Sequence, residues 1–127
     1  MTHSTHETAT KIAALNDLLR KGGFGGTVYF TAGVQERGEA FVTDALRAVR
    51  EFTDFTPDND PYGEHDFGSV LVPEKSAAPI RAAFSGRLRK VFWKIDYYAP
   101  GLTAGSEDPS DRGKTARVLT VMLAEEY

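Results

Sequence analysis

The chain has 127 residues, of which 41% are hydrophobic and 26% charged, and its formal net charge is −3. This length and composition fit one globular domain with its own core. Cysteine is absent, which excludes disulfides, thiolate metal sites and a cysteine nucleophile. No apolar run approaches the roughly 20 residues that cross a bilayer, and the first residues do not resemble a secretory signal. We therefore expect a cytoplasmic protein without membrane contacts.

The first predicted element is a helix. We expect residues 1–7 to be a flexible tail, in which Ser4 and Glu7 have the spacing of a capping box, and residues 8–127 to be a single α/β domain. The helix begins at about Thr8 and is stopped by glycines. Its apolar face consists of Ile12, Leu15, Leu18 and Leu19. Gly22 and Gly23 end the helix.

The glycine-rich segment Gly22–Gly26 lies between this helix and a predicted strand at Thr27–Thr31. A phosphate-binding loop needs the opposite order, with a strand before the glycines and a helix after them. The segment is therefore interpreted as a connector. A turn at Ala32–Val34 then leads into a second helix over Gln35–Phe52, whose apolar stripe is Phe41, Val42, Ala45, Leu46, Val49 and Phe52.

Residues 53–65 predict an irregular loop, because Asp, Asn, Pro and Gly dominate them. A strand is predicted at Asp66–Val72. Residues 73–87 are expected to be a connector that contains a short helix. Ser76 would cap this helix, and Ile80 and Phe84 would pair on one of its faces.

Strict alternation predicts a strand at Leu88–Tyr98. Its core face would be Val91, Trp93, Ile95 and Tyr97, and its other face would include Lys94, Asp96 and Tyr98. Residues 99–114 form a long polar loop. The continuous apolar run Thr115–Ala124 suits either a buried strand or a buried helix, and its β-branched residues favour the strand.

These elements predict an α/β (α+β) fold with about four strands in a mostly antiparallel sheet. Two main helices would pack on the sheet, in the chain order α-β-α-β-β-β. The last three strands would form an antiparallel meander.

Four segments resemble a bacterial domain family of unknown function that is often encoded on plasmids and other mobile elements. They are TPDNDPYGEHDFG at Thr56–Gly68, FTAGV at Phe30–Val34, FWKIDYY at Phe92–Tyr98 and RVLTVMLAEEY at Arg117–Tyr127. The resemblance covers most of residues 14–127 and implies no reaction. It does imply a mobile-element setting, in which small accessory proteins often interfere with host defence.

Charge is segregated along the chain. Residues 51–66 contain six acidic and no basic residues, and residues 75–94 contain six basic and no acidic residues. Two interpretations are open. In the first, the two segments lie close together and form ion pairs, or their charges are simply solvated. In the second, the segments are two binding surfaces of opposite charge. The candidate binding residues are Asp58, Asp60, Tyr62, Glu64, His65, Arg87, Arg89 and Lys90.

The acidic loop also offers oxygen ligands for a divalent cation at Asp58, Asp60 and Glu64, although its spacing does not match an EF-hand. The alternative is a turn-rich loop whose side chains bond to its own backbone, with no metal and no cofactor. His65 could act as a general base oriented by Asp66 or Asp96. Adjacent strand residues point to opposite faces, however, so His65 and Asp66 would not pair directly.

Three functions remain as hypotheses. The first is a non-enzymatic interaction protein, an anti-defence or other mobile-element accessory factor that binds a protein partner. The second is a small metal-dependent hydrolase or nuclease that uses His65 and the loop carboxylates. The third is a nucleic-acid-binding module, since Arg87, Arg89 and Lys90 lie beside Phe84 and Phe92.

Overall fold

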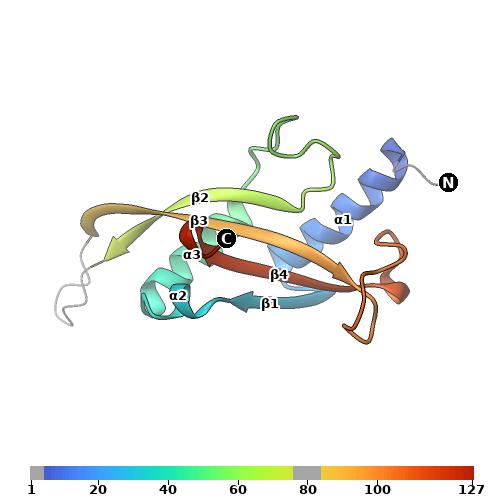
Figure 1. The fold of residues 1–127 in the computed structure, drawn as a ribbon. Helices are drawn as coiled ribbons and strands as arrows, with labels where there is room; N and C mark the ends of the chain where they lie inside the picture. Colours follow the sequence, from blue (N-terminus) through green and yellow to red (C-terminus); the bar gives the residue numbers. More distant parts are fainter. Residues whose placement is uncertain (1–4, 76–83) are drawn as a thin grey trace.

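The computed structural model describes residues 5–75 and 84–127, which form a four-stranded sheet with two main helices on one face (Figure 1). This confirms the predicted α+β class. No helix in these two segments is both long and apolar enough to cross a membrane. The elements in chain order are α1 (His6–Gly22), β1 (Gly26–Phe30), α2 (Ala32–Gln35), α3 (Glu39–Glu51), β2 (Phe67–Lys75), β3 (Phe84–Tyr98), the 3-10 turn η1 (Arg112–Lys114), β4 (Ala116–Leu123) and η2 (Ala124–Glu126).

The strand order is β1-β4-β3-β2. β2, β3 and β4 are joined as neighbouring antiparallel strands, which confirms the predicted meander. β1 pairs in parallel with β4, placing Val28 opposite Leu119. β4 is paired on both sides and mostly buried, which explains its continuous apolar run. This run is the reason why the sequence alone suited either a strand or a helix here.

The core lies between the inner face of the sheet and the helices. Val91, Trp93 and Ile95 of β3 are buried, as the alternation predicted. The α3 stripe supplies Phe41 and Ala45 to the same cluster. One set of side chains of each central strand thus faces the helices, and the other set lies on the opposite face of the sheet.

Helix α1 begins at His6, slightly earlier than predicted, and its N-cap is Thr5, whose Oγ1 accepts a hydrogen bond from the amide of Thr8 at 3.0 Å. The prediction for Leu18 was wrong, since this side chain is 41% exposed. The buried stripe instead contains the polar residues Asn16 and Arg20. Ser4, the cap considered in the sequence, lies outside the described residues.

The predicted helix over Gln35–Phe52 starts later than expected, as α3 at Glu39, and a short helix, α2, precedes it. Thr31 caps the short α2, which starts where a turn was expected. The chain then passes through Gly38 at a φ of 95° before α3 starts at Glu39. A φ in this left-handed region interrupts an α-helix and is accessible to glycine at little cost. The break explains why the helical pattern becomes regular only after Gly38.

β2 and β3 are longer than predicted, extending to Lys75 and starting at Phe84. The prediction of a short helix reaching Phe84 was therefore wrong, because strand pairing between the two ends extends into the expected connector. Ser76 and Ile80, the other residues of that prediction, lie outside the described residues.

Candidate functional site

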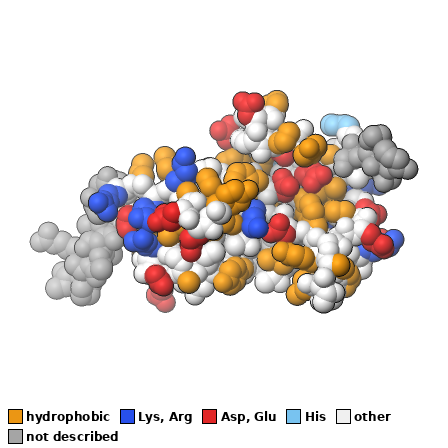
Figure 2. All heavy atoms as spheres, in the orientation of Figure 1, with side chains coloured by type: hydrophobic (Ala, Val, Ile, Leu, Met, Phe, Trp, Pro, Cys, Tyr) orange, Lys and Arg blue, Asp and Glu red, His pale blue; other side chains and the backbone are white. Residues whose placement is uncertain are grey.

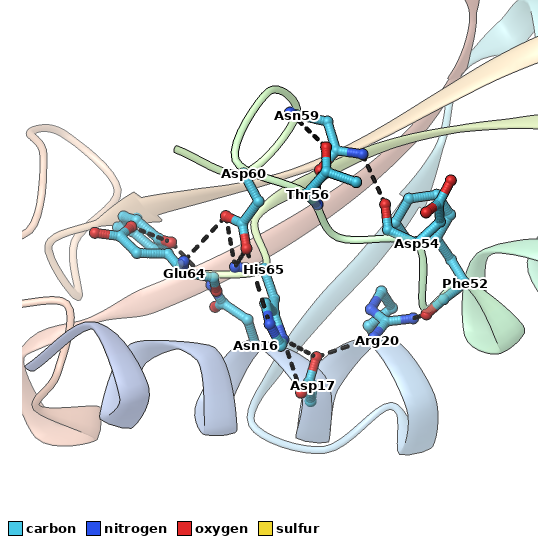
Figure 3. Close-up of polar contacts among 11 residues, drawn as sticks. Asn16, Asp17, Arg20, Phe52, Asp54, Thr56, Asn59, Asp60, Glu64 and His65 are labelled. Carbon is cyan, nitrogen blue, oxygen red and sulfur yellow. Dashed lines mark hydrogen bonds and ion pairs between the residues drawn. The ribbon is translucent and has the colours of Figure 1, made fainter. Parts of the chain in front are cut away.

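The loop between α3 and β2 folds against α1 (Figure 3). Asp60, which is only 8% exposed, accepts hydrogen bonds from the amides of Glu64 and His65 at 3.1 and 3.2 Å through Oδ1. Earlier in the loop, the Asn59 side chain accepts from the amide of Thr56 and donates to the carbonyl of Asp54. The polar side chains of this segment therefore bond to its own backbone and fix its shape.

His65 is at the centre of the site. Its backbone has a φ of 57°, and its ring stacks on Phe55 with the ring centroids 3.9 Å apart. Its Nδ1 lies 3.1 Å from Oδ2 of Asp17 on α1, and its Nε2 lies 3.8 Å from Oδ2 of Asp60. Both ring nitrogens thus face carboxylates. Neither carboxylate was the one expected to orient His65, since the sequence indicated Asp66 or Asp96 for that role.

Asp66 and Asp96 occupy other positions. Asp96 lies on the opposite face of the sheet and pairs with Lys94 at 3.0 Å. Asp66 begins the pairing of β2 with β3, its carbonyl accepting from the amide of Ile95. Burial, and next the nearby Glu64 carboxylate, raise the pKa of Asp66 to about 6.

A second polar network adjoins the His65 centre. Asn16 is completely buried, and its Nδ2 donates to the Glu64 carbonyl and to the Tyr97 hydroxyl at 2.9 and 2.8 Å. The Tyr97 hydroxyl donates to Glu64 Oε1 at 3.0 Å, and Arg117 Nε donates to Asn16 Oδ1 at 2.9 Å. Burial strongly raises the pKa of Tyr97 and lowers that of Arg117. The network joins α1, the loop, β3 and β4.

Arg20 extends the same arrangement into the core. Its guanidinium is 1% exposed and donates to the carbonyls of Val49 and Phe52 at the end of α3. It also pairs with Asp17 at 2.9 Å and lies over the ring of Trp93. A cation at a helix C-terminus satisfies carbonyls that have no helical partner. Asp17 therefore connects Arg20 to His65 (Figure 3).

The sequence missed Asn16, Asp17 and Arg20, although all three are central to this site. They occupy adjacent turns of α1, where polar residues are ordinarily expected to face solvent. The only signal in the sequence was their helical spacing beside the apolar residues. Their partners come from the loop, β3, β4 and the end of α3, which sequence proximity does not indicate.

The predicted binding residues divide between two places. Asp58 is exposed, as is Tyr62 at 75%, on the loop that holds His65. Arg87, Arg89 and Lys90 lie near the other end of the β2–β3 pair. Arg89 is bound by Glu125 at 2.9 Å and approaches Glu74 at 3.9 Å. None of the ion pairs between described residues joins the acidic segment 51–66 to the basic segment 75–94.

The metal hypothesis finds no ligand set in the described segments, where no group of three or more His, Asp or Glu side chains has an arrangement that could hold a metal ion. Asp60 uses its buried carboxylate for loop amides, and Glu64 Oε1 accepts from Tyr97. Asp58 is exposed. The described polar contacts of this site are ion pairs and hydrogen bonds among its own residues.

Fold and site together define a small α+β domain with a one-sided sheet, in which a polar network fastens the α3–β2 loop to α1. A family model described as "protein of unknown function (DUF3768)" matches residues 30–126, and the chain belongs to this family. Neither a curated protein nor a solved structure gives a significant match. Helix α1, with Asn16, Asp17 and Arg20, precedes the matched region.

Proposed function

We propose that this protein is a non-enzymatic interaction module that binds a protein partner through the outer face of its sheet. The observation that supports this is an apolar surface on the face opposite the helices. An antiparallel sheet with one face free normally has polar side chains there. Here that face, which we call the outer sheet face, carries Phe67, Leu71, Leu88, Phe92 and Tyr127.

The three aromatic residues of this set form a connected cluster. The rings of Phe67, Phe92 and Tyr127 contact one another at centroid distances of 5.4 to 5.8 Å. Tyr127 is 75% exposed, Leu71 57% and Leu88 54%. Hydrophobic side chains gather over the central strands in Figure 2, which has the orientation of Figure 1. A contiguous exposed apolar surface is a usual feature of protein interaction sites.

Charge favours a different protein over a second copy of this chain. The charged residues of β3 on the outer sheet face are Lys90, Lys94 and Asp96, two cations and one anion. The whole chain has a net charge of −3. Lys94 and Asp96 pair with each other, which leaves Lys90 as the excess positive charge of β3 on this face. Two copies placed face to face would each bring the same excess charge, whereas a partner with acidic groups around an apolar centre would be complementary.

Nucleic acid is less well supported by the same surface. Phe92 lies between two lysines, an arrangement that can stack and neutralise a single strand. The aliphatic side chains of Leu71 and Leu88 offer no stacking, and Arg89 already has acidic partners. Protein is therefore the proposed partner, and the mobile-element setting of the resembled family makes a component of host defence our proposed target.

The polar centre around His65 is assigned a structural role in this proposal. Its side chains bond to one another and to backbone groups, which fixes the loop, α1 and the sheet relative to each other. The hydrolase alternative is supported by the Asp17–His65 pair and by the raised pKa of Asp66. It predicts a catalytic loss in a His65→Gln variant that remains folded, and the interaction proposal predicts unchanged partner binding in that variant.

The test compares Leu71→Glu with Leu18→Glu, which places the same charge on an exposed leucine of α1. Partners captured from host cells would be identified, purified and titrated against each variant. We expect Leu71→Glu to weaken binding at least about tenfold, Leu18→Glu to leave it unchanged, and Lys90 to crosslink to the partner. Equal binding by both variants, salt-sensitive capture of nucleic acid alone, or self-association through the outer sheet face would contradict the proposal.

A further inference from the structure

The free edge of β1 differs from the other edge of the sheet. β1 and β2 are the two edge strands. β2 carries Pro73 and a register irregularity at Glu74 and Lys75, and both features oppose the addition of another strand. β1, with the sequence GTVYF, contains neither a proline nor a charged residue. Because prolines, charged residues and strand irregularities are the usual protection of a sheet edge, β1 is less protected than β2 against the addition of a strand.

The backbone groups of β1 alternate in direction. The amide of Thr31, just after β1, donates to the Val121 carbonyl in β4 at 3.1 Å. Successive strand residues direct their backbone groups to opposite sides, so those of Val28 and Phe30 face away from β4. The Phe30 carbonyl agrees with this, since it accepts from Gln35 Nε2 at 2.6 Å. The amide and carbonyl of Val28 thus face outward.

A groove lies along this edge. Its volume is about 620 Å³, and it is lined by β1, α2 and the first turns of α3. The apolar part includes Val28, Phe30 and Val42, and the polar part includes Gln35 and Glu39. Edge-strand backbone beside a helix-lined groove is the geometry in which extended peptides add to a sheet. Main-chain groups would bind the peptide backbone, and the groove would accept alternate side chains.

We infer that β1 and this groove bind an extended segment of a protein partner, which adds as a strand beside Val28 and carries an apolar residue next to a lysine or arginine. We infer the basic residue because two exposed glutamates would attract it: Glu39, which lines the groove, and Glu36, which lies just before α3. A second copy of this chain is less suitable, because two β1 edges would bring both pairs of glutamates together. This inference rests on the proposed interaction function but uses a separate surface.

The test uses a phage-displayed library of random peptides about ten residues long, the length range of an added strand. We expect selection to enrich peptides with an apolar residue beside Lys or Arg. Hydrogen exchange at the Val28 and Phe30 amides should slow in the complex, because both become hydrogen-bonded. Val28→Pro, which removes an outward amide without removing a bond to β4, should weaken binding at least about tenfold.

Glu39→Lys provides a second variant that leaves β1 intact, with Glu51→Lys at the other end of α3 as its matched control. Glu39→Lys should shift selection toward acidic peptides, and Glu51→Lys should not. Peptides that bind Val28→Pro as well as wild type, unchanged exchange at Val28, no enrichment, or dimerisation through β1 would each overturn the inference. Leu71→Glu should retain peptide binding, so failure at β1 and failure at the outer sheet face remain distinguishable.

Discussion

Asp17 Oδ2 lies 3.1 Å from His65 Nδ1, and the same carboxylate group, through Oδ1, lies 2.9 Å from the buried guanidinium of Arg20. One side chain of α1 therefore links the loop before β2 to the C-terminal end of α3. The Arg20 side chain is 1% exposed, and the Asp17 carboxylate provides its only ion pair within the described segments.

Replacing Asp17 with alanine should destabilise the fold substantially. The change leaves a buried guanidinium without its carboxylate, and we expect a loss of about 2–3 kcal/mol in the free energy of unfolding. Chemical denaturation followed by tryptophan fluorescence measures this, because Trp93 lies under Arg20. Asp58→Ala, at an exposed loop position, should change stability by less than about 0.5 kcal/mol. Equal effects of the two changes would contradict the linking role of Asp17.

Gly68 is required by the close approach of Trp93. A Cβ atom at this position would lie 2.4 Å from Trp93 Nε1. Gly68→Ala should therefore push the buried indole out of position and cost about 1–3 kcal/mol of stability. Thermal unfolding and near-ultraviolet circular dichroism would record the loss. Ser69→Ala, on the next and exposed residue of β2, is the matched control and should be nearly neutral.

The raised pKa of Asp66 predicts a pH dependence of stability. The pKa is about 6 in the folded chain, against an ordinary value of 3.8. Between these values the folded state binds more protons than the unfolded state, so this group's contribution to stability falls as pH rises. Asp66→Asn should remove the dependence. It should be more stable than wild type by about 1–2 kcal/mol at high pH, after allowance for solvent screening, and similar to it near pH 4.

Unfolding curves for wild type and Asp66→Asn at a series of pH values provide the measurement. The difference between the two proteins isolates the contribution of Asp66 from that of other groups. Asp58→Asn should not reproduce this difference. A difference that is constant with pH, or largest below pH 4, would contradict the assignment.

Glu126 holds the C-terminal turn in place. It accepts hydrogen bonds from Thr31 Oγ1, the Gly33 amide and the Leu123 amide. Burial alone would raise its pKa, but these hydrogen bonds hold the pKa below its ordinary range. Glu126→Ala should cost about 1–2 kcal/mol and should weaken the contact of Tyr127 with Phe92. Nuclear Overhauser effects between the two rings would report this, with Glu107→Ala as the exposed control.

The sequence predicted the regular part of the fold well. The alternation in β3 identified its buried face, and the apolar spacing after Gly38 identified α3, because both patterns reflect burial on one side of a repeating element. The apolar run at Thr115–Ala124, which forms β4, was ambiguous because its residues are not buried on one side only. It is mostly buried, so no alternation remains in the sequence to separate strand from helix.

The site was much less predictable. His65 and Asp60 were recognised as candidates from their chemical type, but Asp17 was not, and neither carboxylate was expected as a partner of His65. Asp17 comes from a helix far earlier in the chain, and Asp60 becomes a neighbour only through the fold of the loop. The outer sheet face was also missed, because the exposure of Leu71 and Leu88 depends on which side of the sheet the helices occupy.

The parallel pairing of β1 with β4 has a consequence for how the chain acquires its structure. β1 lies near the start of the described sequence and its only strand partner near the end. The meander of β2, β3 and β4 can assemble from neighbouring segments, but β1 must wait for a long loop to close, which slows folding. During synthesis, β1 and its apolar side chains would stay unpaired until β4 had left the ribosome, and this interval is when chaperones and proteases would have access to them.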